Sequence, residues 1–201
     1  MIFRSKSFSE IWPRSIDIRC SIVIKEASLS EVFHATEKIK KETMNNEWLC
    51  PNSSGQLDEK QIKWNSRYNQ ALGIFKFFYI DIGIRLKLEE IDKRVLFFVA
   101  YFRGVPVGVL QLLITDGLPK VVFLATHCGI RGCGALLIEY AVNKSQQLGM
   151  GGKLQLSPYE GARATYMAMG FTEAGEHLEL YPADRNDKWK WNEATGRYRF
   201  C

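Results

Sequence analysis

The chain has 201 residues and a formal net charge of +5, and 46% of its residues are hydrophobic and 12% aromatic. This length fits one domain, and this composition can fill a hydrophobic core, which argues against a disordered protein. The longest uninterrupted apolar run, Val95 to Phe102, is too short to cross a bilayer. The first residues lack the apolar stretch of a secretory signal. We expect a cytoplasmic protein without a membrane partner; a dedicated export route that needs no such signal stays open.

The cysteines and histidines do not group into a metal site or a disulfide framework. The five cysteines have no Cys-x-x-C pair and stand apart at Cys20, Cys50, Cys128, Cys133 and Cys201. The three histidines share no ligand spacing either. This pattern predicts reduced thiols and no bound metal. The modest positive charge permits an acidic partner without demanding one, since no block of five like charges occurs.

The first 90 residues give a mixed signal. Alternation of apolar residues from Ile16 to Lys25 predicts a strand, and Ser28 or Ser30 is a suitable cap for a helix that runs to about Lys41. Composition predicts a loop at residues 45–56, because it contains proline, glycine and several small polar residues.

The stretch that follows predicts a polar helix at Leu57–Leu72. The next stretch, Phe75–Leu88, is apolar and aromatic, and its pattern does not separate strand from helix.

From residue 94 onward the elements are clearer. We predict strands at Arg94–Phe102, Val107–Thr115, Val121–Thr126, Lys153–Leu156, His177–Tyr181 and within Trp189–Phe200, and helices at Gly132–Leu148 and just before Phe171. Residues 103–106 form a hairpin turn in this scheme, and residues 192–196 form another. The resulting class is α+β, with helices on a largely antiparallel sheet that contains one central βαβ unit.

A glycine-rich loop joins the strand at Val121–Thr126 to the helix that follows it. The loop is Gly129-Ile130-Arg131-Gly132-Cys133-Gly134. Unpaired N–H groups and the positive end of the helix dipole meet there, so the loop is suited to bind a phosphate. A plain tight turn is the alternative. The spacing does not match a dinucleotide fingerprint, and no Gly-Lys-Ser/Thr follows as in a P-loop.

The loop and a second motif resemble the GCN5-related N-acetyltransferase (GNAT) superfamily. The family pattern Q/R-x-x-G-x-G/A is matched at Gly132 and Gly134, whereas Gly129 replaces the basic or amide residue. The resemblance implies a GNAT-like fold over one domain, residues 1–201. It covers residues 94–181 best and leaves residues 1–90 as the variable, substrate-side part.

The second motif is a helix that ends in Tyr-x-x-x-Gly-Phe. It is matched by Ala162, Tyr166, Gly170 and Phe171, while Tyr159 replaces the asparagine that often starts this helix. In the family this tyrosine is the general acid that protonates the departing thiolate, and a phenol with a pKa of about 10 suits that task. A core tyrosine is the alternative.

The resemblance implies acetyl-coenzyme A as cosubstrate and names the residues that bind it. Leu124 and Thr126 would expose backbone groups to the pantetheine arm, and the loop would bind the pyrophosphate. The expected cofactor-binding set is Leu124, Thr126, Ile130, Arg131, Gly132, Cys133, Gly134 and Ala135.

No motif in the sequence identifies the general base. The strand at Val121–Thr126 contains no glutamate, which many relatives place there. His127 titrates near neutral pH and is our candidate, although a loop histidine commonly faces solvent. Glu160 and Glu179 are alternatives, and a water-relayed base would leave no sequence signal.

The expected reaction is acetyl transfer to a primary amine by direct attack. The basic charge and the missing acidic base favour a macromolecular amine, on a protein or an aminoacyl-tRNA. A small amine such as a polyamine or aminoglycoside is the alternative substrate, and a catalytically inactive binding protein is the alternative class. A homodimer is left open.

Overall fold

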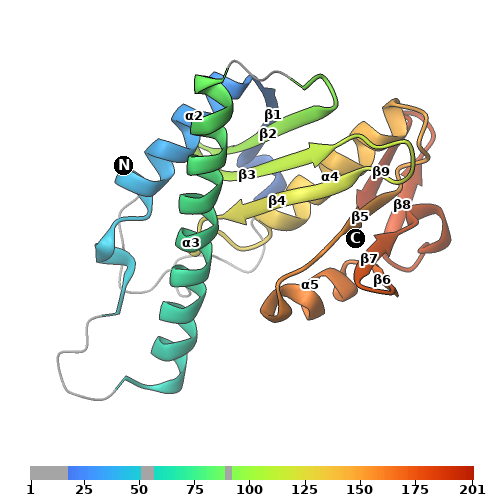
Figure 1. Cartoon of the computed structure of the whole chain (residues 1–201). Helices are drawn as coiled ribbons and strands as arrows, with labels where there is room; N and C mark the ends of the chain where they lie inside the picture. The colour runs from blue at the N-terminus through green and yellow to red at the C-terminus, as the bar shows by residue number, and fades with distance from the viewer. Residues whose placement is uncertain (1–17, 51–56, 89–91) are drawn as a thin grey trace.

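The computed structural model of the chain describes residues 18–50, 57–88 and 92–201 (Figure 1). The start of the chain, including the first two residues of the predicted strand at 16–25, lies outside the described residues. So do residues 51–56 of the predicted loop.

In the described ranges, seven strands form one mixed sheet in the order β1-β2-β3-β4-β5-β7-β6. Their bounds are β1 Ile22–Ala27, β2 Val95–Phe102, β3 Val105–Leu113, β4 Lys120–Thr126, β5 Leu154–Leu156, β6 Thr172–Ala174 and β7 His177–Leu180. The β4–β5 pair is parallel and the other pairs of this sheet are antiparallel. Helix α4, Cys133–Gln147, connects β4 to β5. The predicted α+β class with one βαβ unit is therefore confirmed.

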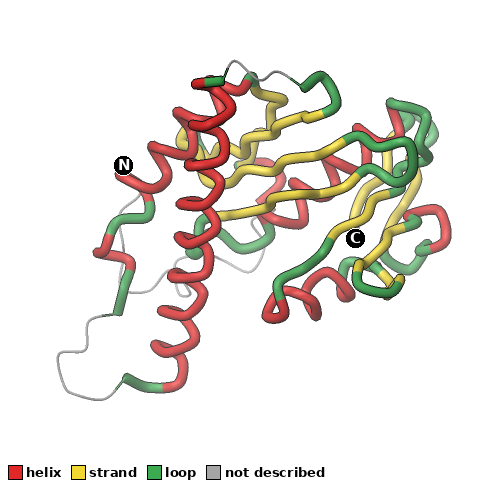
Figure 2. Tube along the Cα trace, viewed as in Figure 1, coloured by secondary structure: helices red, strands yellow, loops and turns green. Residues whose placement is uncertain are grey.

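The helices cover both faces of this sheet (Figures 1 and 2). Helices α2, Leu29–Lys38, and α3, Glu59–Lys87, pack on one face. Helix α4 packs on the other face, together with a separate hairpin formed by β8, Trp189–Asn192, and β9, Arg197–Phe200. The remaining short elements are α5 Arg163–Ala168, the π-helix η2 Ile39–Thr43, and the 3-10 turns η1 Ile18–Cys20, η3 Asn46–Trp48, η4 Glu160–Ala162 and η5 Pro182–Asp184.

Two hydrophobic clusters fill the spaces between these layers. Strand β3 contributes to both, because successive side chains point to opposite faces. Val109 packs under α2 and α3, and Leu110 packs against α4. Residues 106–112 of β3 are all buried, as expected for a central strand covered on both sides.

The ambiguous segment Phe75–Leu88 belongs to α3, which continues the predicted polar helix without a break. Asp58 caps the helix, and Asp58 and Gln61 form a reciprocal capping box. The buried residues Phe75, Phe78 and Ile82 are three and four positions apart, so they share one helix face. The segment looked apolar all round because the opposite face also carries exposed apolar residues such as Phe77 and Ile84.

Two predicted boundaries were wrong, and one strand was missed. The first strand begins at Ile22 and is preceded by η1, and β6 was missed. The β2–β3 turn contains only Arg103 and Gly104, both with positive φ, so the predicted turn at 103–106 was too long. Pro106 is tolerated inside β3 because the register shifts there.

Candidate functional site

Strand β4 changes the face to which its side chains point halfway along its length. Gln111 on β3 lies opposite Phe123, but Leu112 lies opposite Val121, so Val122 is an extra residue in β4. As a result Val121 packs on the α4 side and Phe123 on the α3 side, although they are two residues apart. Val122 itself is 38% exposed. The bulge therefore presents backbone and an apolar side chain at the middle of the strand.

Strands β4 and β5 pair over a very short length and then diverge (Figure 1). Their register contains only Lys120 opposite Gln155 and Val121 opposite Leu156. Among the described residues, the part of β4 from Val122 to Thr126 has no strand partner on the β5 side. Leu124 and Thr126, both predicted to bind the cofactor, lie in this part. Their backbone therefore lies where an extended ligand could pair with it, and their role in cofactor binding stays a prediction.

The N-terminus of α4 lacks a capping side chain. Gly132 precedes the helix with φ of 80°, a left-handed conformation that favours glycine. The N–H of Leu136 bonds to the carbonyl oxygen of Gly132 at 3.2 Å. The first-turn N–H groups of Cys133, Gly134 and Ala135 cannot bond within the helix, so they are available to an anion.

The predicted loop residues divide into a buried and an open set. Ile130 and Cys133 are buried, so their side chains anchor the loop. Arg131 is exposed and makes no side-chain hydrogen bond or ion pair among the described residues. A Cβ at Gly134 would lie 3.7 Å from Leu124 Cδ2, an ordinary contact. Gly134 thus allows a close approach without being required for the fold.

Gly129 has a clear packing role. A Cβ at this position would lie 2.8 Å from Cζ3 of Trp48, which comes from η3 in the N-terminal half. A glutamine or arginine here would collide with the indole, so the departure from the family pattern follows from the presence of Trp48. Sequence reasoning missed Trp48, whose role follows from its contacts with Gly129 and with the ring of His127.

His127 is a buried structural residue. Its Nε2 donates to the carbonyl oxygen of Thr43 at 2.8 Å, and its Nδ1 accepts from the Gly129 N–H at 3.1 Å. Burial lowers the pKa of His127, and Trp48 packs edge-on against its ring with centroids 4.4 Å apart. In the neutral ring, each nitrogen is therefore already occupied by a hydrogen bond. The expectation that this histidine faces solvent was wrong, and its geometry does not support a role as general base.

The two cysteines that flank the loop are buried thiols. Burial raises the pKa of Cys128 to about 11 and that of Cys133 to about 12. A thiol is nucleophilic only as the thiolate, so both side chains are inert at neutral pH. They pack the loop and do not suggest an acyl-cysteine route.

Tyr166 lies on α5 and packs against the cluster on the α4 side. Its ring meets Phe171 edge-on at 5.7 Å between centroids. Burial raises the pKa of Tyr166 to about 12, and its hydroxyl has no hydrogen-bond partner among the described residues. The side chain is therefore a protonated donor with an unused hydroxyl. This combination suits a general acid better than a purely structural tyrosine.

Of the alternative bases, Glu179 makes no contact with the loop among the described residues. Glu179 on β7 accepts from the Tyr181 hydroxyl at 2.9 Å. The side chain of Glu160 lies outside the described part. Within the described ranges, no three His, Cys, Asp or Glu side chains gather as metal ligands, and no helix combines the length and apolarity needed to cross a bilayer.

Sequence reasoning also missed Gln111, which lies opposite Phe123 beside the bulge. Its side chain is 2% exposed, and its Oε1 has no hydrogen-bond partner in the described part of the chain. Burying an amide oxygen without a hydrogen-bond donor costs free energy, so such an oxygen normally accepts a hydrogen bond from some other group.

Comparison with solved structures finds similar arrangements among acetyltransferases. The N-acetyltransferase PaiA of Thermoplasma acidophilum, solved with coenzyme A, is 16% identical, with 79% of this chain and 96% of that chain covered and a TM-score of 0.45. The ribosomal-protein-S18-alanine N-acetyltransferase of Escherichia coli is 15% identical, with 88% of each chain covered and a TM-score of 0.45.

A putative acetyltransferase of the GNAT family from Desulfovibrio desulfuricans is 13% identical, with 80% of this chain and 98% of that chain covered and a TM-score of 0.49. No protein-family model and no curated protein matches the chain.

Proposed function

We propose that this chain is an acetyl-CoA-dependent N-acetyltransferase. The observation that carries the proposal is the divergence of β4 from β5 beside an uncapped helix N-terminus. The first-turn N–H groups of α4 and the exposed Arg131 would bind the pyrophosphate, and the free edge of β4 would pair with the pantetheine arm. The described loop residues fit this ligand, because they offer donors and positive charge and no acidic side chain.

Direct attack of an amine on the thioester accounts for the remaining features. The amine nitrogen bonds to the carbonyl carbon, and N–H groups near the β4 bulge stabilise the developing oxyanion. When the carbon–sulfur bond breaks, the leaving sulfur takes the proton of the Tyr166 hydroxyl, which solvent later restores. The raised pKa of Tyr166 keeps that proton in place until it is needed. The amine loses its proton to water, since no described side chain is positioned as its base.

The cofactor site can be tested with a charge at the helix N-terminus. Ala135→Glu places a carboxylate in the first turn of α4, where it should stabilise the helix by about 0.3–1 kcal/mol but repel a pyrophosphate. Calorimetry should show coenzyme A affinity reduced by roughly tenfold or more with an undiminished melting temperature. Gln146→Glu adds the same charge at the other end of α4 and should leave affinity unchanged. Equal affinity in the wild type and Ala135→Glu would remove the phosphate site.

The acceptor that we favour is an amine on a macromolecule, a protein or an aminoacyl-tRNA. The net charge of +5 supports it, because a small cationic amine is repelled by such a surface. Exposed apolar side chains support it as well. Phe77 is 63% exposed and contacts Phe123, which follows the bulge, with ring centroids 5.8 Å apart. Such groups suit contact with a large partner better than with a polyamine.

Acetyl transfer to aminoacylated bulk tRNA, a lysine-rich protein mixture and spermidine, each at low and high salt, distinguishes these acceptors. Transfer to tRNA should fall steeply with salt because phosphate neutralisation releases counterions. Transfer to protein should fall more gently. Rapid, salt-insensitive acetylation of spermidine alone would contradict the macromolecular acceptor and leave the acetyltransferase proposal intact.

A further inference from the structure

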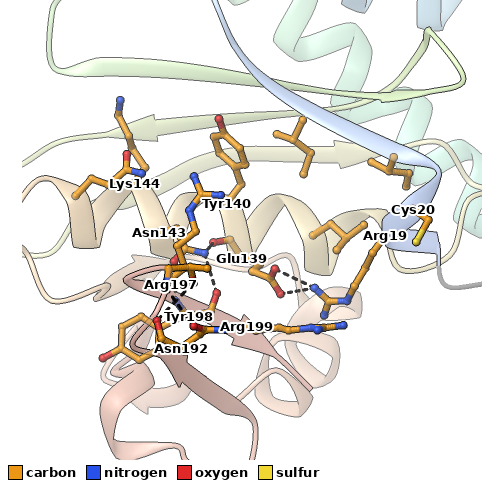
Figure 3. Close-up of a pocket in the computed structure, with 15 residues that line it drawn as sticks. Arg19, Cys20, Glu139, Tyr140, Asn143, Lys144, Asn192, Arg197, Tyr198 and Arg199 are labelled. Carbon is orange, nitrogen blue, oxygen red and sulfur yellow. Dashed lines mark hydrogen bonds and ion pairs between the residues drawn. The ribbon is translucent and has the colours of Figure 1, made fainter.

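A surface pocket of about 480 Å³ lies on the side of α4 that faces β1 and the β8–β9 hairpin (Figure 3). Its helix residues recur every three or four positions from Leu136 to Gln147, so they form one stripe along α4. The stripe begins after the first turn, whose N–H groups we assign to the cofactor. The pocket is therefore a separate feature, and its volume falls in the range of small-molecule sites.

One part of the pocket is apolar. Ile22 and Ile24 from β1 meet Leu136 of α4 there, and all three belong to, or pack against, the hydrophobic cluster on this face. The ring of Tyr140 adds a flat surface to the same wall. An apolar body of one or two rings would find matching contacts on these residues.

The rest of the lining is strongly basic. Four cationic residues, Arg19, Lys144, Arg197 and Arg199, face one acidic residue, Glu139, which gives a formal charge of +3. The carboxylate of Glu139 is already used, because Arg19 donates to both its oxygens at 2.9 and 2.7 Å and the Phe200 N–H donates at 2.8 Å. It therefore does not neutralise the other cations.

Arg197 is the cation best placed to meet a ligand. Lys144 pairs with Glu26 at 2.7 Å, whereas the Arg197 side chain makes no hydrogen bond or ion pair among the described residues. Its guanidinium points toward Tyr140 and Asn143 (Figure 3). Its strand is bound to α4, because Asn143 donates to the Tyr198 carbonyl at 2.9 Å and accepts from the Tyr198 N–H at 2.8 Å.

We propose that this pocket binds a small organic oxyanion, a phosphate or carboxylate attached to an apolar ring system. The guanidinium of Arg197 binds the oxyanion with its planar fork of N–H donors. The ring system packs on Ile22, Ile24 and Leu136. Each half of the ligand thus meets a matching half of the pocket, so neither an inorganic anion nor a neutral ring alone should bind well.

Calorimetry with matched probes tests both halves of the pocket. 1-Naphthyl phosphate and 1-naphthoate carry the oxyanion and the rings, 1-naphthol lacks the anion, and inorganic phosphate lacks the rings. We expect at least one of the two aryl anions to bind the wild type at least tenfold more tightly than naphthol or phosphate. Binding of both aryl anions distinguishes a general oxyanion site from one that selects phosphate or carboxylate.

Variants then locate the binding. Arg197→Ala should weaken the aryl anion by tenfold or more, whereas Lys190→Ala, on the same hairpin but outside the pocket lining, should not. Ala135→Glu should leave aryl anion binding unchanged, and Arg197→Ala should leave coenzyme A binding unchanged. Failure of both aryl anions to bind the wild type, equal binding in Arg197→Ala, or loss in Ala135→Glu would overturn the proposal. The last result would place the probe at the cofactor site.

Discussion

The hydroxyl of Tyr166 is the side-chain group on which the proposed chemistry depends. Tyr166→Phe keeps the ring that contacts Phe171 and removes only the proton donor. We expect the turnover number to fall by roughly 10²-fold or more, the usual contribution of a general acid, while coenzyme A affinity holds. Steady-state kinetics and calorimetry on the same preparation measure both quantities. Wild-type turnover in this variant would make Tyr166 a core residue only.

The ring of His127 should affect stability and not the rate of transfer. Because its folded-state pKa is lowered from 6.5, its contribution is present above about pH 6.5 and is lost as the pH falls further, when the unfolded chain takes up a proton. His127→Gln should lower the melting temperature at pH 7 and flatten its decline between about pH 6.5 and 5. Turnover measured below the melting temperature should stay within a few-fold of the wild type. A 10²-fold loss in a folded variant would restore His127 as the base.

At the scale of elements, the glycine loop is held by the N-terminal half of the chain. Trp48 from η3 packs on Gly129, and Thr43 from η2 accepts from His127. The segment that the sequence marked only as variable therefore supports the loop that we assign to the phosphate.

Gly129→Ala tests that support. The added methyl group would meet Trp48 at 2.8 Å, so we expect a loss of about 1–3 kcal/mol in the free energy of unfolding. Adding Trp48→Phe, which shortens the opposing ring, should recover part of that loss. Urea denaturation of the two single variants and the double variant measures the coupling. Strict additivity of the two changes would contradict the contact.

At the scale of the whole molecule, the buried thiols of Cys128 and Cys133 should make the folded state less stable at high pH. The folded-state pKa values of Cys128 and Cys133 are raised to about 11 and about 12 from 9.0. Because the unfolded thiols ionise near pH 9, the contribution of these two thiols to stability should be constant below that pH and fall between about pH 9 and 12. Cys133→Ala should reduce the slope in that window, in scans at pH 8, 9 and 10 with reductant. An unchanged slope would mean that the thiol ionises freely in the folded state.

The sequence alone determined the class of the fold and most of the second half. The apolar run at Val121–Thr126, the glycines that follow and the periodicity of α4 are local patterns. Such patterns predict the structure correctly when they agree with the tertiary packing. They located the strand, the loop and the helix whose N-terminus we assign to phosphate binding.

Only the tertiary structure decided the features that depend on contacts between distant residues. The roles of Gly129 and His127 depend on Trp48 and Thr43, about 80 residues earlier in the chain, and the bulge at Val122 depends on its register with β3. The pocket around Arg197 exists because α4 side chains bind the edge of β9. Such contacts leave no period or spacing in the sequence. Burial, which lowers the pKa of His127 and raises that of Tyr166, is likewise a property of the assembled chain.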